Sequence, residues 1–424
     1  MCIRDRGKNK KLIKTCTTLA IFTSSFDIFA IVNIGGFNFR FCQLIILPVI
    51  TLYLMNVMAS RRFIEPKGFR YLLIWIVLQL VFCFRSPSLK NAFGYFIWLI
   101  FNGITVLSTC YFCEKAYSRK WLLRTYLHSF VFMSVVGLMQ LFLYAIGVDF
   151  YVAQNWTGRL ARINGFSYEP SYYATYLIMG FVTYASLLIA NEYVWISKTK
   201  LQQGFVWITI ALILSSSRMG WLMVAVFIVY ELSYHSLKKA LTGGRIKKKT
   251  FSFIALALLV VAFAAFAVVY ILKLDLSMFT AGLGIGGGST HSSGPRIEGL
   301  TKCIEIFKKS PIWGYSLGGV DPMIARYDGE VYSTLHNGAA MSVVGEILVA
   351  SGVIGLIPFI FYFLALLFRR TNSANIAYSN VIRALRVAMV FELAILCFNQ
   401  NILRPYTWWH IAILSAEMKS TQGD

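Results

Sequence analysis

The chain has 424 residues, of which 58% are hydrophobic and only 14% are charged. Soluble domains carry about 25% charged residues, so this composition excludes an ordinary soluble protein and indicates an integral membrane protein. The formal net charge of +22 at pH 7 raises the possibility of a nucleic-acid partner, but the basic residues stand in short clusters between apolar runs. That pattern follows the positive-inside rule, with a smaller contribution from anionic lipid or substrate, and argues against nucleic acid.

About twelve apolar runs are separated by polar breaks, and a membrane-spanning helix needs about 20 apolar residues. The opening MCIRDR has the look of a vector or read-assembly remnant, and the lysines up to Lys14 make the first run a retained anchor. We predict an all-α polytopic membrane protein with about 12 transmembrane helices, in a single membrane domain over residues 1–424. The predicted spans are 14–34, 40–59, 69–85, 91–113, 121–147, 170–190, 203–217, 219–234, 251–272, 338–368, 380–398 and 402–418.

Clusters of lysine and arginine occupy every second gap between these spans. Because such clusters stay in the cytoplasm, both termini are predicted to be cytoplasmic. The other gaps face outward, and they include 148–169, the turn at Arg218, the long loop 273–337 and the turn near Arg404. The basic clusters are Lys8 to Lys14, Arg61/Arg62/Lys67/Arg70, Lys115/Arg119/Lys120/Arg124, Lys198/Lys200, Lys238/Lys239/Arg245/Lys247/Lys248/Lys249 and Arg369/Arg370/Arg383/Arg386.

The first long outward gap is unusual because it carries arginines. Arg159, Arg162 and Glu169 precede a span whose first helical turn is set by Pro170. Outward loops are normally poor in arginine, so these side chains are candidate substrate ligands.

Arg218 lies between two short apolar runs, which also fit one broken helix pair, and therefore near membrane depth. An arginine there is costly unless it faces a polar cavity or a partner. Besides a functional role, a snorkelling side chain or an ion pair with an acid such as Glu346 would explain it.

The loop 273–337 begins with a flexible glycine-rich spacer and continues into a helix with Pro295 in its first turn. Arg296 lies beside the free N–H groups of that turn, where an anion is favoured. The pairs Glu298–Lys302 and Glu305–Lys309 stand at i,i+4. An apolar stripe predicts that the helix lies on the membrane surface, and its residues are Ile297, Leu300, Ile304 and Phe307.

The loop ends with His336 and Asn337 at the mouth of the next span, where Asn337 is a candidate N-cap. Arginine binds phosphate oxygens bidentately, so converging arginines indicate a phosphate-bearing lipid headgroup. His336 is the candidate general base, with His291 and His410 as lesser rivals. The alternative is a helix-entry histidine bonded to backbone.

Metal-binding patterns are missing from the sequence, which has no outward D-x-D, no H-E-x-x-H and no spaced Cys/His cluster. The acids Asp321 and Asp328 are ordinary loop acids in this interpretation. We therefore expect neither a metal nor another cofactor, and arginines would stabilise a phosphate leaving group.

Four short motifs in this order resemble the O-antigen polymerase and O-antigen ligase superfamily. They are RINGFSYEPS, SSSRMGW, PRIEGLTKCIEIFKKSPIWGYSLGG and LHNGAAMSVVGEILVASGVIGL, and the resemblance covers roughly residues 150–368. It implies a GT-C-like, metal-independent and inverting membrane glycosyltransferase of the bacterial plasma membrane. The donor it implies is an undecaprenyl-diphosphate-linked glycan, transferred to a sugar hydroxyl at the outer face.

Carried over by motif position, Arg162, Arg218 and Arg296 would bind the lipid diphosphate or an anionic glycan. His336 would activate the acceptor hydroxyl, and Glu169 would orient sugar or arginine. Arg159 and Asn337 remain candidate substrate-binding residues. A chain-length regulator and a flippase are candidate partners.

The leading hypothesis is a polymerase of polysaccharide repeat units, for O-antigen, capsule or exopolysaccharide. A ligase that moves a finished glycan to lipid A-core or another acceptor is the alternative of the same class. The second histidine often seen just before the final His-Asn of ligases is missing here, which favours the polymerase. A non-enzymatic exporter of lipid-linked glycans would need more charges within the spans than Asp27, Arg218, Glu346 and Glu392.

Overall fold

The computed structural model describes most of the chain outside 243–293. The described residues are 3–34, 37–114, 116–156, 160–193, 196–242, 294–332, 340, 342–369, 376–399 and 401–419. The predicted span 251–272 and the candidate site residues Arg159, His336 and Asn337 lie outside them, as does His291.

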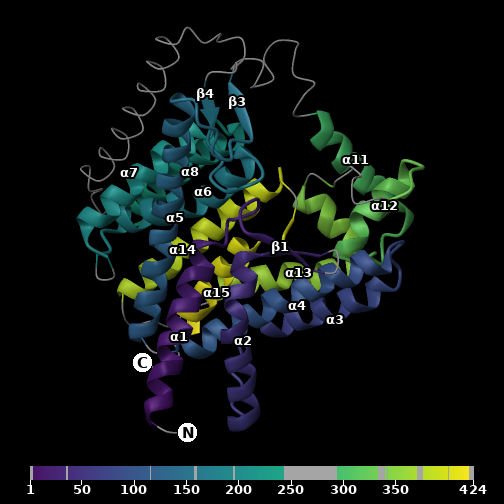
Figure 1. The fold of residues 1–424 in the computed structure, drawn as a ribbon, viewed down its shortest axis with the longest axis horizontal. Coiled ribbons are helices and arrows are strands. Elements are labelled where there is room, and N and C mark those ends of the chain that lie inside the picture. Colours follow the sequence, from purple (N-terminus) through teal and green to yellow (C-terminus); the bar gives the residue numbers. More distant parts are fainter. Residues whose placement is uncertain are drawn as a thin grey trace.

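Thirteen α-helices account for most of the described residues, which confirms a mostly helical protein (Figure 1). Two antiparallel hairpins, β1 (Ile31–Ile34) with β2 (Phe37–Arg40) and β3 (Gln154–Trp156) with β4 (Leu160–Arg162), are small departures from all-α architecture. The helices are α1 (Ile3–Phe22), α2 (Phe41–Ser60), α3 (Phe69–Cys83), α4 (Leu89–Phe112), α5 (Ala116–Ala145), α6 (Pro170–Ala190), α7 (Lys198–Leu214), α8 (Arg218–Thr242), α11 (Gly294–Lys309), α12 (Val320–Tyr327), α13 (Val343–Phe368), α14 (Ile376–Leu396) and α15 (Pro405–Lys419).

Five of the described helices are long and apolar enough to cross a membrane, namely α2, α4, α5, α6 and α13. The helix α3 is apolar but shorter. The chain is therefore a multi-pass membrane protein. The total of about 12 spans stays a prediction. Arg218 begins a helix of its own, so α7 and α8 are two helices joined by a short turn.

The predicted span 14–34 is wrong in its second half, because α1 ends at Phe22 and the chain enters the β1–β2 hairpin. Thr23 and Ser24 donate side-chain hydrogen bonds to the carbonyls of Leu19 and Ile21, which competes with further helix. The backbone N–H of Asp27 then donates to the Phe166 carbonyl at 2.7 Å. Apolarity alone could not reveal this turn, since its bonding partner lies far along the chain.

Contacts between helix ends group these ends on two faces of the molecule. At one face, which we call the site face, Asp27 bonds to Phe166 and the N–H of Val343 donates to the Asn399 carbonyl at 2.9 Å. At the other, which we call the basic face, Arg62 lies 2.9 Å from Glu114 and Lys419 lies 3.7 Å from the same carboxylate. The described residues at these two faces belong to gaps predicted to be outward and cytoplasmic respectively, while the orientation of the faces in a cell stays a prediction.

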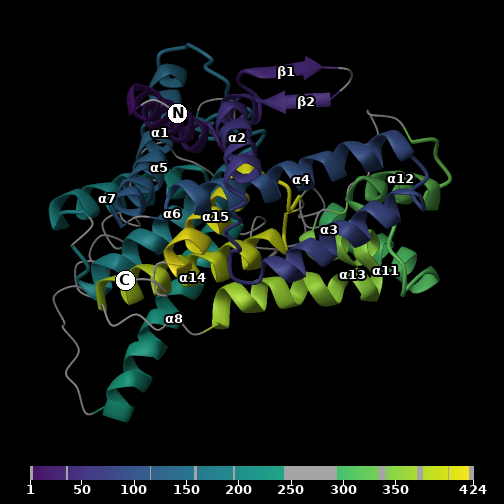
Figure 2. The ribbon, with the colours of Figure 1, turned by 90° about the horizontal axis from the view of Figure 1, so that it is seen from below.

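The helix α6 forms the centre of the bundle. Its side chains are buried almost continuously from Tyr173 to Leu188, and it packs against α14, α7 and α8 (Figures 1 and 2). A helix that is apolar all round must be covered on every side, so α6 is a core element rather than a lipid-facing one. Its first turn lies on the site face.

The segment after α11 is attached to α13 at the point where α13 departs from helical geometry. Gly352 in this helix has non-helical φ 54° and ψ −172°. The freed backbone pairs with the segment after α11: Tyr315 N–H donates to Val349 O and Ser316 N–H to Ala350 O, each at 3.0 Å. The 3-10 turn η1 (Leu317–Gly319) and α12 follow. The segment after α11 is therefore held to α13 by backbone hydrogen bonds.

Candidate functional site

The segment that carries Arg162 is held rigidly by one buried glutamine of α5. Gln140 donates to the carbonyls of Phe150 and Gly165 at 3.0 and 2.7 Å, and its own side-chain oxygen accepts from the N–H of Asn164 and Gly165. Because the Gln140 amide is fully buried and makes all these hydrogen bonds, it fixes the loop. Gly165 adopts φ +56°, a conformation that favours glycine.

Arg162 reaches from this loop to the turn between α7 and α8. Its guanidinium donates to the Gln154 side chain at 2.5 Å and to the backbone carbonyl of Ser216 at 3.1 Å. Burial, together with the positive charge of Arg218, lowers the pKa of Arg162, while the Glu169 carboxylate acts in the opposite direction. The structure therefore brings together three of the predicted residues, Arg162, Arg218 and Glu169.

Arg218 occupies the first position of α8 and is exposed. Ser217 precedes it and its hydroxyl accepts from the Gly220 N–H at 3.4 Å, as an N-cap does. The free N–H groups of the first turn point along the helix axis beyond its N-terminal end, and with the helix dipole they favour an anion. The interpretation of Arg218 as the ion-pair partner of Glu346 is wrong, because that carboxylate accepts from the N–H groups of Asn401 and Ile402.

Glu169 is the residue before α6, with Pro170 at the start of the helix as predicted. Its carboxylate accepts a hydrogen bond from the Ser171 hydroxyl. The Glu169 side chain is half-buried, so the protein restricts its motion while part of it stays accessible at the site face. The carboxylate of Glu169 next to Arg162 suits a residue that orients a guanidinium or a sugar hydroxyl.

Arg296 lies in the first turn of α11, which packs against α13 and α12. Both views draw α11 well apart from α8 (Figures 1 and 2). The convergence of Arg296 with Arg162 and Arg218 therefore stays a prediction.

The predicted apolar stripe of α11 differs from the face that packs. Cys303 and Ile306 are buried, whereas Ile297 and Ile304 are exposed. The reason is Gly345 of α13, which lacks a side chain and admits Cys303: a Cβ there would lie 3.0 Å from that of Cys303.

The two ion pairs predicted along α11 have different outcomes. Glu298 pairs with Lys302 as expected, but Glu305 pairs with Lys308 rather than Lys309. Lys302 also pairs with Asp328 at 2.9 Å, so Asp328 is a structural partner of α11 rather than an ordinary loop acid.

A buried charge network that the sequence did not reveal adjoins Glu169. Arg404, in the turn before α15, lies 2.5 Å from the Asp27 carboxylate, which also pairs with Arg40 at 3.0 Å. The Arg404 guanidinium stacks over the ring of Tyr172 at 4.1 Å. Tyr168 lies 5.5 Å from the same guanidinium. The available signal was Asp27 itself, since an acid within an apolar run marks a buried partner or a functional site.

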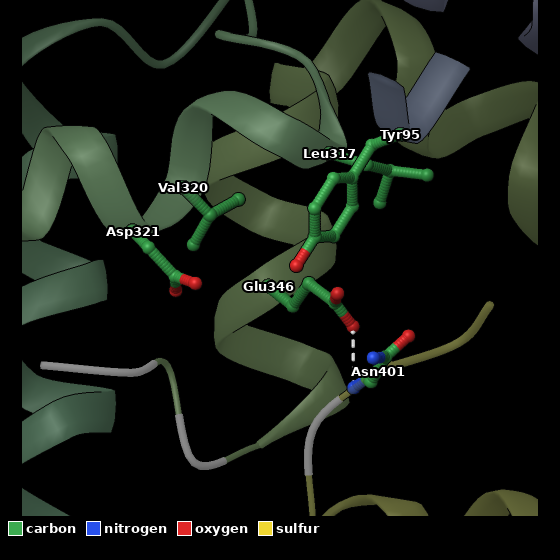
Figure 3. A pocket seen from close by; sticks show the side chains of 6 residues that line it. All are labelled: Tyr95, Leu317, Val320, Asp321, Glu346 and Asn401. Carbon is green, nitrogen blue, oxygen red and sulfur yellow. Dashed lines mark hydrogen bonds between the residues drawn. The ribbon is translucent and has the colours of Figure 1, made fainter. Parts of the chain in front are cut away.

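A small cavity on the same face joins five elements (Figure 3). Tyr95 of α4, Asp321 of α12 and Glu346 of α13 point into it, with the turn at Asn401 as its floor. Its volume is about 10 Å³, which is the space that one water molecule needs. Asp321 is therefore a cavity-lining acid. Glu346 fixes the α14–α15 turn through hydrogen bonds of 2.9 and 3.1 Å to Asn401 and Ile402.

The residues that flank the undescribed His336 and Asn337 also lie on the site face. Ser342 caps α13 by accepting from the Val344 N–H at 3.2 Å, so the predicted N-cap role of Asn337 is wrong. The rival His410 is buried in α15, bonded to Tyr126 and to the Leu385 carbonyl.

A comparison with known protein families found a match for part of the chain. Residues 203–360 match the family model described as O-antigen ligase. This segment of the chain is therefore similar to an O-antigen ligase domain. The matched segment contains Arg218, Arg296 and Glu346 and extends across the loop with His336, and the match confirms the resemblance to the O-antigen polymerase and ligase superfamily. A comparison with curated proteins found no match.

The match supports a glycan-processing membrane enzyme of the ligase or polymerase type. Arg162, Glu169, Asp27 and Arg404 lie outside the matched residues, yet they adjoin Arg218 or the α13 entrance. The site face is therefore assembled from the matched residues 203–360 and from segments before and after them. No group of three or more His, Cys, Asp or Glu side chains within the described residues is arranged to hold a metal ion.

Proposed function

We propose that this protein polymerises undecaprenyl-diphosphate-linked oligosaccharide repeat units into O-antigen, capsule or exopolysaccharide. The observation that carries the proposal is the approach of Arg162 to Arg218 at the first turn of α8. Two like charges held together repel each other, and a diphosphate between them would relieve that repulsion. The match to an O-antigen ligase domain supports a lipid-linked glycan as the bearer of the diphosphate.

The proposed reaction is an inverting displacement that does not need a metal. His336 takes the proton of the acceptor sugar hydroxyl, and the freed oxygen attacks the anomeric carbon of the donor. The bond from this carbon to the diphosphate oxygen breaks, and its electron pair leaves with the diphosphate. Arg162, Arg218 and Arg296 stabilise that developing charge, as preorganised donors do.

The remaining candidates have supporting roles in this proposal. Glu169 orients Arg162 or a sugar hydroxyl, while Arg159 and Asn337 bind the sugars of donor or acceptor. The site face is the outer side of the bacterial plasma membrane and both termini are cytoplasmic. A flippase would supply the donor, and a chain-length regulator would act on the growing product.

Substitution of the arginines tests the proposal. In a host that depends on this gene, Arg162→Ala, Arg218→Ala and His336→Ala should each leave single-repeat glycan, because the transition-state charge or the base is lost. The control is Arg326→Ala, an exposed arginine of α12. Protein amounts in the membrane must match wild type. Normal polymer from the Arg162 and Arg218 variants would refute the proposal.

Ligation of a finished glycan is the second candidate, favoured by the description of the matched domain. The same variants would then accumulate long undecaprenyl-linked polymer instead of single repeats. A glycan ladder with and without the gene therefore separates the two activities. An exporter is less well supported, because the buried acids Asp27 and Glu346 are occupied in structural contacts.

A further inference from the structure

A second cavity lies on the basic face, between α1, α2, α4 and α5. Its volume is about 500 Å³, within the range of small-molecule sites. The helix α5 begins at this cavity and ends near the loop with Arg162. Its 30 residues are about 45 Å long, which separates the two sites by the thickness of the protein.

One face of α1 forms the basic wall of this cavity. Lys10, Ile13, Lys14 and Thr17 line it, at the spacing of residues that share one side of a helix. The Lys14 ammonium lies 5.5 Å from the centre of the Trp121 ring, which also lines the cavity. Two cations on one wall favour an anion.

The acid at the cavity does not cancel this charge. Glu114 lines it, but its carboxylate already pairs with Arg62 at 2.9 Å and with Lys419 at 3.7 Å. Arg62 and Lys419 thus supply two positive charges against the one negative charge of Glu114. Lys10 and Lys14 add two more positive charges. The surroundings of the cavity are therefore positive, and an anionic occupant is complementary to them.

The rest of the wall is apolar or uncharged, and exposed apolar side chains lie next to it. Val49 and Phe112 line the cavity. Leu12 of α1 and Met55 of α2, neighbours of lining residues, expose 42% and 56% of their surface. Such side chains are lipid-facing in a membrane protein. A soluble anion would use the lysines alone, whereas a phospholipid would also use the apolar wall.

We propose that this cavity binds the headgroup of an anionic phospholipid. The phosphate lies between Lys10 and Lys14, and the acyl chains leave along the exposed apolar residues of α1 and α2. Basic pockets between membrane helices bind anionic lipid headgroups in this way. The lipid anchors α1 against α2, α4 and α5.

The test uses the full chain purified in a neutral detergent, with native mass spectrometry to measure phosphatidylglycerol binding. The double variant Lys10→Ala/Lys14→Ala should lower the affinity about 30-fold. The matched control Lys198→Ala/Lys200→Ala removes two exposed lysines from α7 and should change the affinity less than about twofold. Phosphatidylcholine should bind weakly to all forms. Equal losses in both double variants, or equal competition by inorganic phosphate, would overturn the proposal.

A second measurement locates the lipid without changing the lysines. Brominated phosphatidylglycerol should quench the tryptophan fluorescence of the native chain more than that of Trp121→Phe, because Trp121 lines the cavity. The conservative Phe keeps an aromatic ring in place. Quenching of equal extent in both proteins would place the lipid elsewhere and refute the site.

Discussion

The carboxylate of Asp27 lies 2.5 Å from a terminal nitrogen of Arg404, and both side chains are almost completely buried. This pair joins the end of α1 to the turn before α15, two segments from opposite ends of the chain. Arg40 adds a second cation at 3.0 Å from the same carboxylate. The network holds together the segments of the site face that lie next to Tyr172, in the first turn of α6.

We predict that Asp27→Asn is the more damaging of the two single changes at this pair. It leaves Arg404 and Arg40 facing each other without an acid, and breaking a buried pair costs about 3–5 kcal/mol. Arg404→Gln should cost less, because Arg40 still pairs with Asp27. Chemical denaturation in detergent micelles measures both free energies of unfolding.

The control for this experiment is Arg62→Gln, which removes an exposed pair with Glu114 and should cost at most about 1 kcal/mol. The double variant Asp27→Asn/Arg404→Gln should cost less than the sum of the single changes, since Arg404 is then no longer left as an unpaired buried charge. Strict additivity would contradict a direct interaction.

Glu346 is predicted to act through the turn that it holds rather than through its charge. One of its oxygens accepts from both Asn401 and Ile402, and a glutamine oxygen can accept the same bonds. Glu346→Ala should therefore lose about 2–3 kcal/mol of stability, because two N–H groups lose their partner. Glu346→Gln should keep most of the stability and normal polymer. If Gln keeps the stability but abolishes polymer, the carboxylate itself is required.

Gly352 is predicted to be irreplaceable in α13. Its φ is +54°, and a Cβ would lie 2.5 Å from the Ile312 carbonyl oxygen. Gly352→Ala should cost well above about 2 kcal/mol and shift the thermal midpoint accordingly, because strain and a backbone clash add. Gly147 is the matched control: its φ is +86° but nothing lies within 4 Å of a Cβ. Gly147→Ala should cost only about 1 kcal/mol, from the left-handed backbone. Equal costs of the two substitutions would mean that α13 does not need the non-helical conformation at Gly352.

The thiol of Cys303 is predicted to be inert in the folded protein. Burial, followed by the charges of Asp321 and Glu346, raises the pKa of this thiol to about 12. Alkylation of the Cys303 peptide by iodoacetamide at pH 8 should therefore be slow until the protein is unfolded. Because the folded state binds this proton more tightly, Cys303 makes stability fall as the pH rises from about 9 to about 12. Cys303→Ala should remove that part of the pH dependence. Rapid alkylation of the native protein would show that α11 leaves α13.

Local signals account for what the sequence predicted well. Pro170 marks the start of α6, and a helix starts at Gly294 next to Pro295, because proline lacks the N–H that a first turn leaves unused. Arg162, Glu169 and Arg218 were identified as arginines and an acid in outward gaps, and the structure brings them together. The packing face of α11 was mispredicted, because Gly345 on another helix decides which side of α11 can approach.

The sequence by itself determined that the chain forms apolar helices whose ends alternate between two faces. In lipid the backbone must satisfy its own hydrogen bonds, so long apolar runs have little choice but helix, and basic clusters mark alternate ends. Only the tertiary structure decided that α1 stops short, that α13 opens at Gly352, and that Asp27 meets Arg404. Those features depend on partners far along the chain, and neither composition nor spacing contains that information.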